Sequence, residues 1–218
     1  MLIKWMVCDV PVDRRADFAA AQRQWAPIAC ATGLVGQVGG WNQHGQACVL
    51  AMWADGASYE RFFAHVHDAI TEFNDQARTF THLSVTLAQG LLILPGEAVG
   101  IGAALRTTGL LRVADCRVRG GRVPHFVRAQ MRVWAPGMAG CSGMLGGRFS
   151  AVEADEGRYL VTTLWADEAS HEAYREGPFR ALRQRAQASD DLDEVVGHRV
   201  IVDPRWRVVP VEGGASLG

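Results

Sequence analysis

Runs of apolar residues along the chain predict short β-strands, and apolar residues at helical spacing between them predict α-helices. Residues 2–9 form the first strand-like run, and Phe18, Trp25 and Ile28 then recur on one face of a helix that ends at Gly33. Further strand-like runs lie at residues 34–41, 47–54 and 81–94. The first half of the chain is therefore predicted to run strand, helix, strand, strand, helix, strand.

The second predicted helix follows Asp55, which suits an N-cap, and contains the stretch RFFAHVHDAITEFN. Asp68 falls opposite the apolar stripe of this helix and is expected to face water. His67 and Asn74 share one flank, whereas His65 points elsewhere, so the two histidines do not predict a metal site. The apolar stripe consists of Tyr59, Phe62, Phe63, Val66, Ile70 and Phe73.

The second half of the chain repeats the first. The stretch AAAQRQWAPIACATGLVGQ resembles VRAQMRVWAPGMAGCSGMLGG, and the motif WAD-x-AS occurs in both halves. Cys116 follows Cys8 by 108 positions and Trp165 follows Trp53 by 112, with the order of matched residues unchanged. Such spacing indicates an internal repeat. The other matched pairs are Phe18 and Phe126, Gln22 and Gln130, and Trp25 and Trp134.

A βαββαβ unit has the ferredoxin-like arrangement, an antiparallel sheet with both helices on one face. Its other face requires a covering layer, so we expect an α+β fold in which two such units pack back to back as an internal pseudo-dimer. The first unit is predicted at residues 1–94 and the second, degenerate unit at residues 109–210. A glycine-rich linker is predicted at residues 95–108 and a flexible tail at residues 211–218.

Composition argues against several classes of function. The 22 Lys and Arg residues balance 23 Asp and Glu, with a formal net charge of -1, so no nucleic-acid partner is expected. No apolar run suits a signal peptide or a bilayer span, which predicts a cytoplasmic protein without a membrane partner. The five cysteines include no CxxC pair and predict reduced, buried thiols. No nucleotide-binding or HExxH motif is present, and no metal site is predicted.

The candidate site rests on differences between the two copies. His67 corresponds to Phe179, and this exchange predicts a position that points into a core or cavity. His67 is then either a partly buried structural histidine or a ligand contact and general base. Asn74, on the same flank, is a candidate ligand contact.

The second strand shows a parallel contrast. Gln37, Trp41 and Asn42 stand where the second copy has small or apolar residues. The neighbouring Gly39 and Gly40 indicate either a bulge or the close approach of a ligand or backbone. An indole beside an amide would also suit the wall of a small-molecule pocket.

Three further residues are candidates for substrate binding. Gln22, like Gln130, falls on an apolar helix face and either forms a structural hydrogen bond or contacts substrate. Lys4 corresponds to Arg112, and these cations either pair across the pseudo-two-fold axis or hold an anionic ligand. Trp5 is predicted to lie in the core or to form a pocket wall.

Some of these motifs resemble a known family. WADEASHEAYREGPFRAL resembles the strand-to-helix corner of antibiotic-biosynthesis monooxygenase-like domains of the dimeric α/β-barrel superfamily. In the first copy, IKW, Q..W, GLVGQVGGWN and HD are similar to motifs of the YdbC-like domain of unknown function. The resemblance implies two units packed as a barrel. It implies no settled activity, because the superfamily includes cofactor-free oxygenases, haem-degrading enzymes, small-molecule isomerases and proteins without known catalysis.

By this resemblance, the first hypothesis is a small-molecule-binding protein that acts as a cofactor-independent monooxygenase or isomerase-like enzyme on a small aromatic or quinone-like compound. Its site would lie in the first copy. His67 would be the base, Asn42 and Gln37 would orient the substrate, and Trp41 and Trp5 would form the walls.

The alternative is a non-catalytic ligand-binding or stress-associated protein whose second copy is only a structural partner. Haem binding or degradation is a weaker hypothesis, because the haem ligand of such relatives would fall on Arg183 in the second copy and Thr71 in the first. No cofactor is therefore expected. The chain is expected to act as a monomeric pseudo-dimer or as a homodimer.

Overall fold

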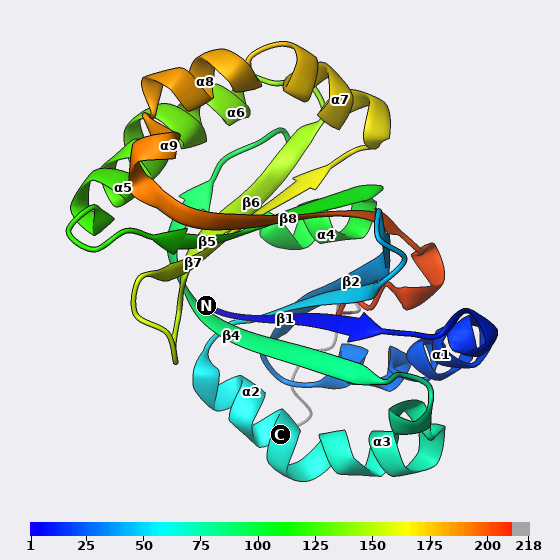
Figure 1. The fold of residues 1–218 in the computed structure, drawn as a ribbon. Coiled ribbons are helices and arrows are strands. Elements are labelled where there is room, and N and C mark those ends of the chain that lie inside the picture. Colours follow the sequence, from blue (N-terminus) through cyan, green and yellow to red (C-terminus); the bar gives the residue numbers. More distant parts are fainter. Residues whose placement is uncertain (211–218) are drawn as a thin grey trace.

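The computed structural model describes residues 1–210, and the predicted tail at residues 211–218 lies outside them. The described strands form one closed barrel with helices on two opposite sides (Figure 1). Around the barrel the strand order is β1-β3-β2-β8-β5-β7-β6-β4, and the paired neighbours are antiparallel. The strands are β1 (Leu2–Asp9), β2 (Leu34–Asn42), β3 (Ala47–Trp53), β4 (His82–Leu94), β5 (Leu110–Val118), β6 (Met144–Val152), β7 (Arg158–Trp165) and β8 (Leu192–Val202).

Helices of the first copy cover one side of the barrel and those of the second copy cover the other (Figure 1). The α-helices are α1 (Arg15–Arg23), α2 (Gly56–Phe62), α3 (Asp68–Asn74), α4 (Ile101–Thr107), α5 (Val123–Ala129), α6 (Ala135–Ala139), α7 (Glu168–Glu176), α8 (Phe179–Arg185) and α9 (Ala188–Asp191). Two π-helical segments, η3 (Phe63–His67) and η5 (Gln130–Trp134), join α2 to α3 and α5 to α6. The 3-10 turns are η1 (Val12–Arg14), η2 (Ala26–Cys30), η4 (Gln76–Arg78) and η6 (Pro204–Trp206).

Each copy contributes four neighbouring strands, in the orders β4-β1-β3-β2 and β8-β5-β7-β6. The two sheets join at the β2–β8 and β4–β6 pairs. This arrangement confirms the predicted α+β fold of ferredoxin-like units packed as a pseudo-dimer. Since strands alternate in direction around the barrel, β1 and β5 run the same way and the pseudo-two-fold axis follows the barrel axis.

Side chains alternate between the barrel interior and the helix-covered outer face, as expected for β-strands. Ile3 and Trp5 of β1 share the interior core with Leu111 and Val113 of β5, and all four are almost fully buried. The outer faces form separate cores beneath the helices, with Trp53 in the first copy and Trp165 in the second. The space between helices and sheet is therefore distinct from the barrel interior in both copies.

The segment predicted as a glycine-rich linker contains helix α4. Ala104 and Leu105 of this helix are completely buried and belong to the core that fills the barrel. This helix was not predicted, because the glycines at its start lower helix propensity. Tertiary packing nevertheless stabilises a short helix there.

The predicted strand-to-helix corners are confirmed in both copies. The carboxylates of Asp55 and Asp167 accept hydrogen bonds from the backbone N–H groups of Ser58 and Ser170, at 2.7 and 2.8 Å. Such N-caps satisfy donors that the first helical turn leaves free.

The apolar stripe predicted for residues 59–73 is wrong at Phe63 and Phe73. Phe73 is 82% exposed, and Phe63 is 47% exposed. The π-helical segment η3 holds more residues per turn than an α-helix, so the α-helical spacing of the prediction does not hold across it. Val66 and Ile70 still pack against the core. Asp68 faces solvent, as predicted, with its side chain 81% exposed.

The described helices are all too short or too polar to cross a bilayer. Within residues 1–210 no cluster of three or more His, Cys, Asp or Glu side chains could hold a metal ion. All five cysteines are free. Cys8, Cys48 and Cys116 are buried as predicted. Cys141 is only partly buried, and Cys30 is exposed because it ends the short turn η2 on the surface.

Candidate functional site

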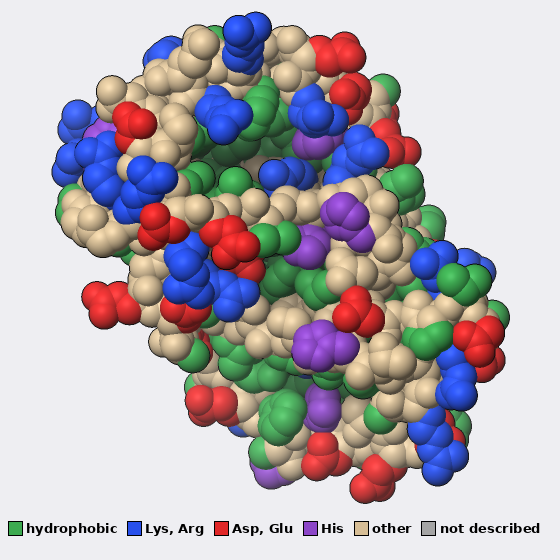
Figure 2. All heavy atoms as spheres, viewed as in Figure 1, with side chains coloured by type: hydrophobic (Ala, Val, Ile, Leu, Met, Phe, Trp, Pro, Cys, Tyr) green, Lys and Arg blue, Asp and Glu red, His purple; other side chains and the backbone are tan. Residues whose placement is uncertain are grey.

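A cavity of about 510 Å³ lies between the helices of the second copy and the outer face of β5 and β7. Figure 2 shows it as a hollow above β8, with apolar side chains in its floor and Lys or Arg side chains around it. The volume falls within the usual range of small-molecule sites. Its apolar lining includes Ala114, Phe126, Trp134, Met138, Val161, Tyr174, Phe179 and Ala188, and its polar lining includes Arg112, Cys116, Gln130, Thr163, His171, Arg175 and Arg183.

Arg112 lies on the outer face of β5, directly across from Thr163 of β7. Its guanidinium donates a hydrogen bond to the carbonyl of Val113, but among residues 1–210 no carboxylate forms an ion pair with it. Burial lowers the pKa of this guanidinium, because desolvation disfavours the charged form. An uncompensated buried cation is costly unless a ligand supplies the opposite charge.

Two neutral polar groups of the cavity also lack partners. Gln130 and His171 are each only 3% exposed. Within the described part of the chain, Gln130 Oε1 and His171 Nδ1 form no hydrogen bond. Burial, with the nearby positive charges of Arg112 and Arg175, lowers the pKa of His171 from 6.5 to about 4, so its ring is neutral at pH 7 and one ring nitrogen can accept a hydrogen bond.

The equivalent space in the first copy is occupied by side chains of the chain itself. Gln76 of η4 donates from Nε2 to Gln22 Oε1 at 2.8 Å and accepts from Trp25 Nε1 at 2.7 Å. Asn74 accepts from the Gln76 backbone at 3.1 Å. Of the two roles considered for Gln22, a structural hydrogen bond or a substrate contact, its amide forms the structural hydrogen bond.

At two positions the second copy has a smaller residue than the first copy, and these differences leave the cavity open. Gln76 follows Asp75, whose φ is 50°, and Ala188 follows Gln187, whose φ is 48°. These matching left-handed residues make Gln76 and Ala188 equivalent. The spacing of Cys8 and Cys116 likewise makes Met6 equivalent to Ala114. Both smaller residues line the cavity, so the second copy lacks the side chains that fill this space in the first.

The π-helical segment η5 explains how the second copy keeps its aromatic wall. Three positions separate Gln22 from Trp25, but four separate Gln130 from Trp134. A π-helical turn accommodates the extra residue. Trp134 consequently packs on Phe179 with ring centroids 5.8 Å apart, much as Trp25 packs on His67 at 5.6 Å.

The residues proposed from the sequence lie in three separate places. Lys4, Gln22, Asn74 and His67 lie between the helices and sheet of the first copy. The His67 ring stacks on Phe63 at 4.5 Å between centroids, and its Nδ1 lies 3.0 Å from the exposed carboxylate of Asp68. The His67 side chain is therefore partly buried, with 20% of its surface exposed, and its role as a base stays a prediction.

Gln37 and Trp41 lie elsewhere, on the outer face of β2 beneath the C-terminal segment. The Gln37 backbone pairs with Val208, and Trp41 packs on Trp206 with centroids 5.5 Å apart. A Cβ atom on Gly40 would lie 1.9 Å from the carbonyl oxygen of Ile201. The paired glycines thus permit the close approach of another strand, which was one of their predicted purposes.

Asn42 and Trp5 lie at the mouth of the barrel. Asn42 Nδ2 donates to Gln46 Oε1 at 2.9 Å and lies 3.1 Å from His198 Nδ1. His198 packs against the edge of Trp5 at 5.4 Å between ring centroids. Trp5, Gln46 and His198 line a smaller cavity of about 210 Å³. The structure therefore does not bring the predicted residues into one site.

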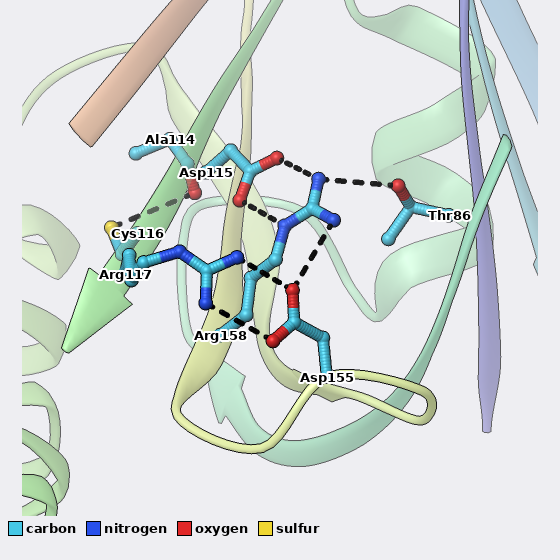
Figure 3. A network of polar contacts seen from close by, with 7 residues as sticks. All are labelled: Thr86, Ala114, Asp115, Cys116, Arg117, Asp155 and Arg158. Atoms are coloured by element: carbon cyan, nitrogen blue, oxygen red, sulfur yellow. Dashed lines mark hydrogen bonds and ion pairs between the residues drawn. The ribbon is translucent and has the colours of Figure 1, made fainter. Parts of the chain in front are cut away.

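The smaller cavity contains a paired arginine and aspartate. Arg158 donates to Asp115 through Nε at 2.8 Å and Nη2 at 2.5 Å. Figure 3 shows Arg158 between Asp115 and Asp155, with the Thr86 hydroxyl beyond it and Arg117 on Asp155. The hydrogen bonds with Asp115 raise the pKa of Arg158. These charges already compensate one another, unlike the unpaired Arg112 of the larger cavity.

Comparisons with known proteins agree with the fold. Residues 2–88 match the family model described as Domain of unknown function (DUF4937). Over 91 residues, the chain is 34% identical to the uncharacterized protein YdbC of Bacillus subtilis (strain 168), covering 40% of this chain and 76% of that protein. The chain belongs to this family. The DUF4937 match ends before the second copy, so the cavity lies outside the matched residues.

Solved structures share the architecture of this DUF4937 chain. A candidate monooxygenase from Lactobacillus acidophilus NCFM has a TM-score of 0.73 with 9% identity, covering 95% of each chain. A candidate monooxygenase from Fusobacterium nucleatum subsp. nucleatum ATCC 25586 has a TM-score of 0.74 with 10% identity, covering 92% of this chain and 91% of that chain. An anthrone oxidase-like protein has a TM-score of 0.65 with 13% identity, covering 93% and 91%. At such identities these similarities show the shared fold alone.

Lys4 provides a stability prediction. Its ammonium lies 5.7 Å from the centre of the Tyr59 ring, and burial lowers its pKa from 10.5 to about 8. Between these two pH values the unfolded chain therefore binds more protons than the folded chain. The free energy of unfolding consequently rises as pH increases from 8 to 10.5, because the lysine loses its unfavourable charge. We expect Lys4→Met to raise the free energy of unfolding by about 2 kcal/mol at pH 7. Urea unfolding at pH 7 and pH 10.5 tests this, and an equal effect at both would contradict it.

Proposed function

We propose that this protein binds a small, largely apolar molecule in the cavity of the second copy. The observation that carries the proposal is a set of three polar residues in a cavity with aromatic walls. Among the described residues, Gln130 Oε1 and His171 Nδ1 have no hydrogen-bond partner, and the Arg112 guanidinium has no ion-pair partner. Buried polar groups are nearly always hydrogen-bonded in folded proteins. A bound molecule would supply the missing partners, and the aromatic walls would bury its apolar body.

A cavity-filling variant tests this proposal. We expect 2-naphthol to bind the wild-type protein in isothermal titration calorimetry, and Ala114→Phe to weaken this binding by roughly ten-fold or more because the new ring occupies the cavity. Met6→Phe, at the equivalent position of the first copy, is the matched control and should leave the affinity unchanged. Thermal unfolding would check that both variants fold. Equal binding by wild type and Ala114→Phe would refute the proposed location.

Cofactor-independent oxidation or isomerisation of an aromatic or quinone-like compound is the finer alternative. It needs a base, and a general base is most effective with a pKa near the working pH. His171, whose pKa is about 4, is better suited to accept a hydrogen bond than to remove a proton. The catalytic roles predicted for His67 and Asn42 stay predictions, and binding is the function that the geometry supports best.

The residue present at the position expected for a haem ligand does not suit that group. This position in the second copy is Arg183, which lines the cavity. A guanidinium is permanently protonated, so it has no lone pair to coordinate iron. We therefore favour an organic ligand without a metal at this position.

A further inference from the structure

In the first copy, the side chain of Gln76 occupies the space that corresponds to the cavity of the second copy. It therefore indicates which ligand groups would fit that cavity. The Gln76 amide reaches between helices and sheet and donates to Gln22 at 2.8 Å. In the second copy Gln130 remains, but Ala188 replaces the glutamine. We infer that the ligand is an organic anion that also carries a hydrogen-bond donor, with the donor on Gln130 and the charge on Arg112. This inference rests on the proposed function of the same cavity.

The donor on the ligand follows from an acceptor that has no partner. Gln130 Oε1 has no donor among the described residues, and the neutral His171 ring has an unpartnered Nδ1. Both side chains are 3% exposed, so bulk water does not satisfy them freely. A hydroxyl or amide N–H of the ligand would take the place that Gln76 Nε2 fills in the first copy. A ligand with acceptors only would leave Gln130 Oε1 unsatisfied.

The negative charge follows from the cations around the cavity. Arg112 has no carboxylate partner within residues 1–210, and Arg183 likewise forms no ion pair there. Arg175 pairs with Glu172 at 3.1 Å. The two acidic residues lining the cavity, Asp193 and Glu194, are both exposed, and Asp193 pairs with Arg119 at 3.0 Å. Arg112 is partly buried whereas Arg183 and Glu194 are exposed, so the partly buried unpaired charge of the cavity is positive. A carboxylate is the geometric complement of a guanidinium.

The walls limit the rest of the ligand to an apolar, preferably aromatic body. Trp134 and Phe179 pack together on one side, and Tyr174 packs on Phe179 at 5.7 Å between centroids. Phe126 forms another part of the lining. Flat rings can stack or pack edge-on against such side chains. The ligand class is therefore an aromatic carboxylate that bears a hydroxyl or amide N–H.

A pair of probes isolates the charge. We would measure the binding of 3-hydroxy-2-naphthoate and of its neutral carboxamide, 3-hydroxy-2-naphthamide, by isothermal titration calorimetry at pH 7. The anion is expected to bind roughly ten- to hundred-fold more tightly than the amide, as for a charge-assisted hydrogen bond. In Arg112→Met this preference should disappear. Arg132 is an exposed arginine of η5, the segment that contains Gln130, and Arg132→Met should retain the preference.

A second variant tests the place of the donor. Ala188→Gln restores the residue of the first copy, whose amide would pair with Gln130 and occupy the ligand's position. We expect it to weaken the binding of both probes by roughly ten-fold or more while leaving thermal stability equal or higher. This variant adds an internal contact, so it remains informative even if Arg112→Met fails to fold.

The outcomes separate the two proposals. Equal affinity for anion and amide, with both weakened by Ala114→Phe, would overturn the inferred anion and leave the proposed cavity intact. Unchanged binding in Ala188→Gln would overturn the inferred place of the donor. Binding of neither probe, nor of 2-naphthol, would overturn the proposed function together with the inference.

Discussion

Replacing Arg158 with methionine is expected to lower the free energy of unfolding by about 3 kcal/mol at pH 7. The substitution leaves the Asp115 carboxylate unpaired at the barrel mouth, where its side chain is only 15% exposed. Removing one member of a buried pair costs more than the pair itself contributes, because the remaining charge has lost both its water and its partner. The Arg158 side chain is 28% exposed, which places the effect at the lower end for buried pairs. Urea unfolding followed by tryptophan fluorescence would measure it.

Arg117→Met provides the matched control from the same network. Arg117 pairs with Asp155 at 2.7 Å, but its side chain is 46% exposed, so its loss should lower the free energy of unfolding much less than the loss of Arg158 does. The double variant Asp115→Leu/Arg158→Met should recover most of the lost stability, because neither charge remains. Equal losses in Arg158→Met and Arg117→Met would show that the pair at the barrel mouth behaves as an ordinary surface pair.

The second large effect is expected in acid and concerns His171. Burial and the surrounding arginines Arg112, Arg175 and Arg199 lower its pKa from 6.5 to about 4. The unfolded chain therefore binds the proton first as pH falls. The neutral ring makes its full contribution to the free energy of unfolding above pH 6.5. This contribution decreases as pH falls from 6.5 to 4 and is absent below pH 4. The loss attributable to this ring is about 3 kcal/mol.

His171→Phe should remove this share of the acid sensitivity. Because carboxylates titrate in part of the same range, the quantity to measure is the difference in unfolding free energy between wild type and variant at several pH values. That difference should change by about 3 kcal/mol between pH 7 and pH 4. A difference that does not depend on pH would mean that His171 titrates normally in the folded protein. An anionic ligand should reduce the sensitivity, because negative charge beside the ring raises the pKa of His171.

Much of the fold could be predicted from local signals that need no knowledge of long-range packing. The repeat of WAD-x-AS identified the corners that Asp55 and Asp167 cap. Runs of apolar residues predicted the strands of the first copy almost to their ends. The phase of the helix after Phe63 could not be predicted in this way, because nothing in the pattern marks where a π-helical turn adds a residue.

The cavity was harder to predict because it results from missing side chains. Comparison of the copies drew attention to His67, a polar residue gained in the first copy. The decisive differences are smaller residues in the second copy, Ala114 where the first copy has Met6 and Ala188 where it has Gln76. Alanine is unremarkable in a sequence, and the second pair becomes equivalent only through the left-handed residues before it.

The repeat did contain one usable signal. The residue after WAD-x-AS is Tyr59 in the first copy and His171 in the second. Three residues further on, Phe62 corresponds to Tyr174, which also lines the cavity. Extending the comparison by one helical turn beyond the motif would have indicated the second copy as the more polar of the two.

Joining both halves in one polypeptide has an evolutionary consequence. In a symmetric homodimer of a single-unit ancestor, every mutation appears twice, so a glutamine that fills one site fills both. Gene fusion releases the halves from this constraint. One half can then carry residues that form stabilising internal hydrogen bonds, such as Gln76. The other half can carry smaller residues, such as Ala188, that leave a cavity. The tandem arrangement thus allows a division of labour that no symmetric dimer of identical chains can encode.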